Sequence, residues 1–225
     1  MKSASLRTYL TGMLAVAIAG CSTAPRQAVP ERVIPVTGEG GLTPAAQAKA
    51  DSGRPPYTQA DVRFMQGMIS HHAQAIVMAG WAPTHGARQD VLILAQRIEV
   101  AQRDEIELMA RWLLDRREAV PDTNAHHDHA SMDAQRTLSP GMLTADELAQ
   151  MGRANGPEFD RLFLTFMIRH HEGALAMVAE LYSSQGAAQD TDVYRFSTDV
   201  NVDQITEIAR MRVMLRSPPS NGSRP

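Results

Sequence analysis

The chain has 225 residues and a formal net charge of -3 at pH 7, with 22 basic and 25 acidic side chains. No run of basic residues stands out, so binding to nucleic acid is disfavoured and no such partner is expected. The single cysteine, Cys21, excludes an intramolecular disulfide, so the core must supply the stability of the fold.

Residues 1–20 are expected to be a signal peptide that directs export. Lys2 and Arg7 precede an apolar run over residues 10–19, which is too short to span a membrane. The run ends in Ile-Ala-Gly before Cys21, and this ending resembles a bacterial lipobox. Cys21 is therefore expected to be lipidated and to anchor the chain to a membrane. An ordinary signal peptide with an incidental cysteine is the alternative.

The mature chain is thus expected to be a lipoprotein of the bacterial cell envelope that faces the periplasm. Ser22 rather than Asp follows the cysteine, which in a Gram-negative cell resembles an outer-membrane address, although the envelope type stays open. Residues 21–56 contain many prolines and glycines without apolar periodicity, so they are predicted to be a flexible tether. Residues 217–225 are predicted to be a disordered tail.

Residues 57–216 are predicted to form one all-α domain. Proline and glycine end each apolar-periodic segment, and no segment alternates convincingly as a strand. Thr58 with Asp61, and Thr144 with Glu147, fit capping boxes at helix starts. Four long helices and one short helix are predicted, over Thr58–Gly80, Arg88–Arg117, Pro157–Ser184, Asp190–Arg216 and Thr144–Met151.

A repeated motif relates the two halves of this domain. The pattern Phe-x-x-x-Met-Ile-x-His-His-x-x-Ala-x-x-Met begins at Phe64 and again at Phe163. The helix after each copy carries Gln-x-x-Glu-Ile-x-x-Met, starting at Gln102 and at Gln204. Two similar helical hairpins can bury their apolar stripes together as a four-helix bundle. An exchange of hairpins between two copies, which would give a homo-oligomer, is left open.

Helical periodicity turns several polar side chains toward the core. The first histidine of each pair shares a face with the motif methionines, and the second lies about 100° away on the shoulder. On the partner helices, Glu105 and Glu207 lie in otherwise apolar stripes, the second of which is expected to end at Leu215. Because a buried carboxylate needs a partner, we expect both glutamates to meet the His-His pairs near mid-bundle.

This arrangement has two interpretations. A metal-free polar layer of histidine, glutamate and glutamine could fix the helix register. A metal site is the other, since imidazole and thioether donors suit copper and Cu(I) above all. The candidate ligands are Met68, His71, His72, Met78, Met167, His170, His171 and Met177. Further ligands, or groups that orient the imidazoles, are Gln102, Glu105, Met109, Gln204, Glu207 and Met211.

Two further groups of histidines are predicted to matter less. The segment between the hairpins contains His126, His127, His129 and Met132, which could be an accessory metal site or a flexible polar loop. It has no copy in the other half. His85 follows Pro83 in a turn and is expected to be a surface or capping residue.

The repeated motif and its following Gln-x-x-Glu-Ile-x-x-Met helix resemble those of the domain of unknown function 305 family, over about residues 57–216. The resemblance implies a bacterial, mostly exported, ferritin-like four-helix protein. Some members are associated with copper binding and copper tolerance in the periplasm, which points to His71, His72, His170, His171 and the matched methionines. The copies differ, since Ala73 is matched by Glu172 and Gly67 by Phe166. Exact two-fold symmetry of a site is therefore not expected.

Three functions are weighed. The first is an envelope-anchored copper-binding protein that sequesters the ion or passes it on. The second is a ferritin-like metal oxidase, although the motif helices lack the Glu-x-x-His of di-iron bundles. The third is a metal-free scaffold or interaction lipoprotein. No phosphate loop, dinucleotide fingerprint or nucleophile arrangement is present, so the sequence does not favour an enzyme.

Overall fold

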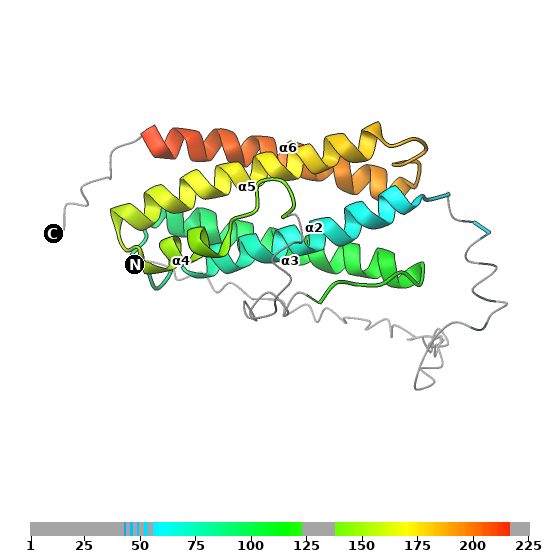
Figure 1. The fold of residues 1–225 in the computed structure, drawn as a ribbon, viewed down its shortest axis with the longest axis horizontal. Coiled ribbons are helices and arrows are strands. Elements are labelled where there is room, and N and C mark those ends of the chain that lie inside the picture. Colours follow the sequence, from blue (N-terminus) through cyan, green and yellow to red (C-terminus); the bar gives the residue numbers. More distant parts are fainter. Residues whose placement is uncertain are drawn as a thin grey trace, which may run out of the picture. The chain divides into compact units, whose positions relative to one another are not determined.

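Four long helices form two antiparallel hairpins in the computed structural model (Figure 1). The structure describes residues 56–122 and 138–216, together with residues 43, 46, 49, 52 and 53. The chain divides into two units, residues 1–47 and 48–225, and every labelled helix belongs to the second. The predicted signal peptide, the lipidation site at Cys21, most of the tether, the His126–Met132 cluster and the tail lie outside the described residues.

The bounds of the helices confirm the all-α prediction. The first hairpin is α2, Gln59–Gly80, with α3, Gln89–Asp115, and the second is α5, Pro157–Ser183, with α6, Thr191–Arg216. The short α4, Ala145–Arg153, precedes α5. Capping boxes begin α2 and α4 as predicted, and Pro157 starts α5 where its missing N–H costs nothing. Within the described residues none of the helices is apolar and long enough to cross a membrane.

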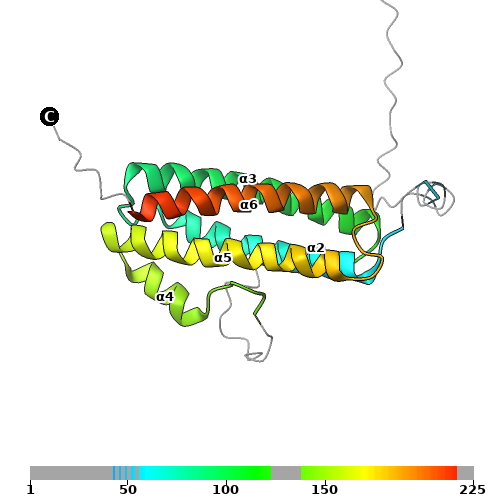
Figure 2. The same cartoon turned by 90° about the horizontal axis from the view of Figure 1, so that it is seen from above.

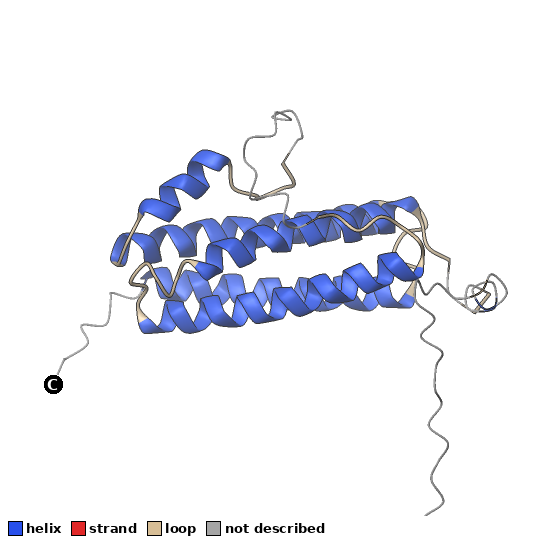
Figure 3. Ribbon diagram, turned by 90° about the horizontal axis from the view of Figure 1, so that it is seen from below, coloured by secondary structure: helices blue, strands red, loops and turns tan. Residues whose placement is uncertain are grey.

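The hairpins pack face to face. Contacts run between α2 and α3, between α5 and α6, and between α2 and α5, and α4 rests on α5. Seen from above, α3 and α6 share one side of the bundle, whereas α4 lies on the other side, beyond α5 (Figure 2). The bundle therefore has a face made by α3 and α6 and an opposite face, made by α2 and α5, that α4 and the loop before it partly cover (Figure 3).

The core consists of two apolar clusters at different levels along the bundle. One contains residues 62–69 of α2 together with residues 174–181 of α5, and it includes Trp112 and Phe196. The other contains residues 75–79 of α2 with residues 159–167 of α5. In both helices the His-His pair falls between the two clusters, so the histidines form a polar layer between two apolar ones.

Each hairpin carries a buried aspartate that accepts a hydrogen bond from the turn of the other hairpin. Asp61 in the first turn of α2 accepts a hydrogen bond of 2.7 Å from the backbone N–H of Ala188, in the turn between α5 and α6. Asp160 in the first turn of α5 accepts one of 3.2 Å from the N–H of Arg88, in the turn between α2 and α3. Asp160 lies 99 residues after Asp61, so the repeat extends beyond the histidine motif and is used in the packing.

One predicted core position is wrong. Leu215 is exposed, and Met214 is buried in its place. From Val200 onward, the buried residues of α6 are Val200, Gln204, Ile208, Met211 and Met214, with Glu207 half-buried beside them. From Gln204 through Glu207 and Met211 to Met214 the spacing is three, four and three residues. This is the heptad-like spacing by which neighbouring helices of a bundle keep one seam in contact, and Leu215 falls off it.

Candidate metal centre

All four motif histidines are completely buried, including the second of each pair, for which the sequence predicted a shoulder position. The imidazoles of His71 and His170 lie at the interface of the hairpins, with ring centroids 3.8 Å apart. His72 and His171 lie farther out, with centroids 6.4 Å and 6.3 Å from the first histidine of their own pair. The two pairs thus form one continuous layer across the bundle.

Burial keeps the central histidines neutral. The pKa of His71 is lowered to about 3, mainly by loss of solvation and then by the neighbouring His72, and the carbonyl of Pro140 offsets part of this lowering. Loss of solvation also holds the pKa of His170 well below its ordinary value, with further lowering from His71. Both rings are therefore neutral and keep a lone pair at neutral pH, and this is the form in which histidine binds a metal.

The outer histidines meet the two glutamates, as the sequence led us to expect. His171 Nε2 donates to Glu207 Oε2 at 2.7 Å. His72 Nε2 lies 2.7 Å from Glu105 Oε2. The second contact has the length of a hydrogen bond, but its N–H is less well aligned, and the atom makes no well-formed hydrogen bond among the described residues. Both glutamates keep about a fifth of their side chain exposed, 20 % for Glu105 and 24 % for Glu207, so they join the layer to solvent.

The buried layer contains many polar atoms without a partner. In the part of the chain that the structure describes, the Nδ1 atoms of all four histidines are buried and make no hydrogen bond, and neither does Nε2 of His170. The amide oxygens of Gln102 and Gln204 share this property. Such atoms are rare in native proteins and call for water or an ion. Here they recur at matching positions of both repeats, which indicates a property of the site rather than a local packing fault.

The candidate methionines are all buried in the clusters that flank the histidines. Met68, Met177 and Met109 belong to one cluster, and Met78, Met167 and Met211 belong to the other. Thioethers therefore lie on both sides of the imidazole layer. Among the described residues, however, no group of three His, Cys, Asp or Glu side chains is arranged to hold a metal ion. Neither three carboxylates nor three imidazoles are thus gathered into a ligand set there, and the soft donors in and beside the layer are imidazole nitrogens and thioether sulfurs.

A segment that sequence reasoning missed covers the layer from the α2–α5 face. We call residues 138–143 the strap. The carbonyl of Pro140 accepts a hydrogen bond of 3.0 Å from Nε2 of His71. The signal was present in the sequence, because Ser139-Pro140-Gly141-Met142 has the Pro-Gly centre of a type II turn. The structure closes this turn with a bond of 3.2 Å from the N–H of Met142 to the carbonyl of Ser139.

His85 lies apart from the layer. Its Nδ1 meets the carbonyl of Trp81 at 2.8 Å, just beyond the end of α2, and its Nε2 meets the carbonyl of Gly152 at 3.0 Å. The predicted capping role is therefore present, with an added tie to α4.

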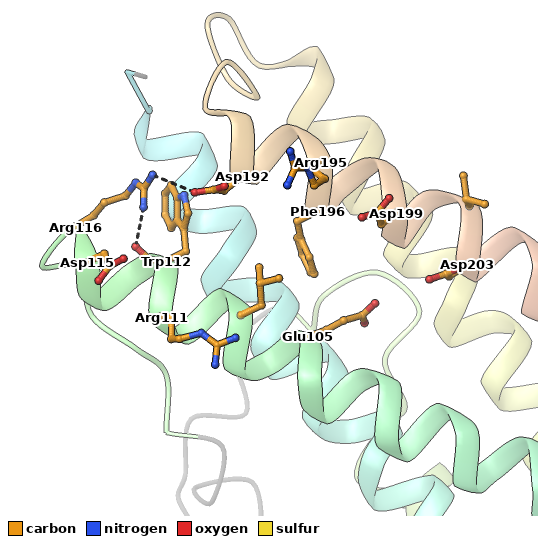
Figure 4. Close-up of a pocket in the computed structure, with 12 residues that line it drawn as sticks. Glu105, Arg111, Trp112, Asp115, Arg116, Asp192, Arg195, Phe196, Asp199 and Asp203 are labelled. Carbon is orange, nitrogen blue, oxygen red and sulfur yellow. Dashed lines mark hydrogen bonds and ion pairs between the residues drawn. The ribbon is translucent and has the colours of Figure 1, made fainter. Parts of the chain in front are cut away.

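A groove between α3 and α6 opens on the other face of the bundle. It has a volume of about 590 Å³, and Figure 4 shows Glu105, Asp199 and Asp203 along it. Loss of solvation raises the pKa of Asp203, and the charges of Glu105 and Glu207 raise it further. Since Glu105 also contacts His72, the groove is the solvent side of the histidine layer.

The fold and the site define a class of protein: a four-helix bundle of two repeated hairpins with a buried histidine layer at their junction. The family model described as "Domain of unknown function (DUF305)" matches residues 61–215. The chain belongs to the DUF305 family.

Solved structures agree with this assignment. A DUF305 fragment from Deinococcus radiodurans is 29 % identical with a TM-score of 0.58, and the match covers 72 % of this chain and 98 % of the other. A candidate secreted DUF305 protein from Streptomyces coelicolor is 24 % identical with a TM-score of 0.58, covers 69 % and 91 % of the two chains, and shows the fold alone.

The protein CopM is a further neighbour, solved in copper-bound forms. Its Cu(II)-bound form is 25 % identical with a TM-score of 0.56, covering 69 % of this chain and 95 % of CopM. Its Cu(I)-bound form is 25 % identical with a TM-score of 0.51, covering 71 % and 96 %. The chain matches no curated protein.

Proposed function

We propose that this protein binds copper at the histidine layer and holds the ion or passes it on in the cell envelope. The observation that carries the proposal is the set of buried imidazole Nδ1 atoms that lack hydrogen-bond partners among the described residues. They belong to both repeats, and the two central rings are held neutral by burial. An ion that accepts soft nitrogen and sulfur donors would satisfy them, and copper is the ion of this kind that a Met- and His-lined site selects.

The outer contacts suit such a site. A histidine that binds a metal through one nitrogen usually donates its other N–H to a carboxylate or a carbonyl. His171 has Glu207 in this role, and His71 has the carbonyl of Pro140. Glu105 lies 2.7 Å from Nε2 of His72, close to the corresponding place. The likeness to CopM, which is solved with Cu(I) and with Cu(II), supports copper as the cargo.

A metal-free polar layer is the competing function, and the two His–Glu contacts favour it, because histidine and glutamate stabilise each other without an ion. A di-iron oxidase has no comparable support, since it needs several carboxylates at one point, and the described residues hold no such group.

Anaerobic Cu(I) titration against a competing chelator separates these functions. The protein should carry Cys21→Ser, together with replacement of His126, His127, His129 and Met132, so that neither the thiol nor the accessory cluster contributes. Copper binding is expected to persist in this background and to be lost when His71→Ala and His170→Ala are added. The matched control is His85→Ala, which removes a histidine outside the layer. Binding that survives loss of His71 and His170 would leave the layer as a structural element.

We also propose that Cys21 carries a lipid anchor and that the bundle faces the periplasm. The apolar run and the small residues before Cys21 support this. Labelling cells with a radioactive fatty acid should mark the protein and should fail with Cys21→Ala. A wild-type protein that takes up no label and is recovered in the soluble periplasmic fraction would disprove the anchor.

A further inference from the structure

The central histidines of the two hairpins, His71 and His170, have different surroundings, because the strap forms a hydrogen bond with His71. The side-chain amide of Gln74, in α2, forms two hydrogen bonds with Leu143 at the end of the strap. Its Nε2 donates to the carbonyl of Leu143 at 3.0 Å, and its Oε1 accepts from the N–H of Leu143 at 2.7 Å. Both contacts are buried, so together they hold Leu143 in place relative to α2.

The other side of the strap rests on α5 because Gly173 has no side chain. A Cβ built on Gly173 would lie 1.9 Å from the carbonyl oxygen of Pro140 and 2.8 Å from Cα of Gly141. These are backbone atoms of a turn, so they could not yield without moving the strap. Gly141 itself has φ of 77°, as the third residue of a type II turn requires. That turn directs the Pro140 carbonyl away from its own closing hydrogen bond and toward His71.

Gln74 and Gly173 occupy equivalent places in the two repeats, 99 residues apart. Gln74 in the first copy holds the strap by hydrogen bonds, and Gly173 in the second copy leaves room for it. The difference between the copies is therefore specific to the strap, and it decides which central histidine receives a carbonyl. His71 receives the carbonyl of Pro140, whereas His170 receives none from the strap. The backbone of His71 raises the pKa of His170, but neither ring nitrogen of His170 makes a well-formed hydrogen bond among the described residues.

A carbonyl oxygen can only accept a hydrogen bond, so Nε2 of His71 must carry the proton. In this completely buried, neutral ring the lone pair then belongs to Nδ1, the atom that makes no hydrogen bond among the described residues. His170 has no such constraint from the strap. The strap thus holds His71 in a single tautomer and sets no tautomer for His170.

We propose that Gln74 is a positioning residue of the site: through Leu143 and the strap it holds the Pro140 carbonyl on His71 and so fixes Nδ1 of His71 as the nitrogen offered to a ligand. That the ligand is a copper ion rests on the proposed function above. The tautomer itself does not, because it is a property of the protein without metal.

The test is the tautomer of each buried histidine, read from ring ¹⁵N chemical shifts of the metal-free, uniformly ¹⁵N-labelled full chain. Wild-type protein is compared with Gln74→Met, which keeps the length of the side chain but removes both hydrogen bonds, and with Gly173→Ala, which displaces Pro140 from the other side. Gly80→Ala is the matched control, because it adds a methyl to the same helix α2 at a place where a Cβ would meet nothing within 4 Å. His171, held by Glu207, is the control within each spectrum.

We expect His71 to be wholly in the Nε2–H form in the wild type and in Gly80→Ala. In Gln74→Met and in Gly173→Ala it should become a mixture of tautomers, while the signals of His171 do not change. A wild-type His71 with its proton on Nδ1 would overturn the proposal, whatever the variants do. So would an unchanged His71 in both strap variants, with helical content confirmed by circular dichroism.

Cu(I) affinity measured on the same proteins provides the second readout. Loss of a group that orients a metal-binding imidazole typically weakens binding by about ten-fold or more. We expect that loss in Gln74→Met and Gly173→Ala and none in Gly80→Ala. If no protein binds copper, the proposed function fails and the tautomer result still decides the role of Gln74. If all four proteins bind copper equally although the tautomer changes, Gln74 fixes the tautomer of His71 without affecting copper binding. The proposal is then wrong in that part.

Discussion

Acid should destabilise the metal-free bundle in a pH range in which few carboxylates titrate, because buried His71 resists protonation. Its pKa is about 3 in the folded state, against 6.5 for an ordinary histidine. Above pH 6.5 the ring is neutral in both states and contributes no pH dependence. As the pH falls below 6.5, the unfolded chain takes up a proton that the folded chain refuses, so stability decreases until the pH reaches about 3.

The size of the effect follows from linkage. Between pH 7.5 and 4.5, one histidine with these two pKa values should cost about 3 kcal/mol of unfolding free energy, with a limiting slope of about 1.4 kcal/mol per pH unit. His170 should add to the loss, since its pKa is lowered too. Asp160 and Asp203 act in the opposite sense, because their pKa values are raised and protonation favours the folded state. Their influence grows toward the acid end, so the comparison should stop at pH 4.5.

Urea titrations at half-unit intervals of pH, followed by circular dichroism with a chelator present, measure this dependence. His71→Gln removes one titrating ring, so its unfolding free energy should change less steeply with pH than that of the wild type. The reasoning is refuted if wild-type stability is flat between pH 7.5 and 4.5. It is also refuted if the variant has the same slope, because the pH dependence would then arise elsewhere.

Three further predictions concern stability at neutral pH and can be checked by the same urea titration. Asp61→Ala removes a helix cap and leaves the buried N–H of Ala188 without its acceptor, so it should cost about 2–3 kcal/mol; a loss below 0.5 kcal/mol would mean that water replaces the carboxylate. Trp112→Phe removes the hydrogen bond of 3.1 Å from the indole N–H to Asp190 and should cost about 1–2 kcal/mol, whereas an unchanged midpoint would count against that bond. Gly80→Ala should stabilise by up to about 1 kcal/mol, since Gly80 lies in α2 with nothing within 4 Å of a built Cβ; destabilisation would show that the end of α2 needs a glycine.

The helices were predictable because local sequence signals mark where each one begins and ends. Capping boxes at Thr58 and Thr144, Pro157 at a helix start and the glycines after helix ends set the bounds to within about two residues. The repeat then predicted the hairpins, because two copies of one amphipathic pattern can bury each other. The contacts of Glu105 and Glu207 with histidines were also predictable, since a carboxylate in an apolar stripe needs a partner.

The strap could not be placed from the sequence. Its contacts with His71 and Gln74 join residues 69 positions apart across a segment with no periodicity. A Pro-Gly turn indicates that the chain bends at residues 140–141, but not what it bends onto. The roles of Asp61 and Asp160 were within reach, because both follow the 99-residue repeat. They were missed because the capping box with Thr58 already accounted for an aspartate at position 61.

The reciprocal hydrogen bonds of these two aspartates have a consequence for assembly. Each hairpin lacks the acceptor for an N–H in its own turn and carries the acceptor that the other hairpin needs. The first hairpin made alone would therefore have an unsatisfied N–H in its turn and, at the other end, a carboxylate oxygen without its donor, and so would the second. The two should remain incomplete as separate peptides and should recover the fold when mixed, as complementary fragments of one molecule.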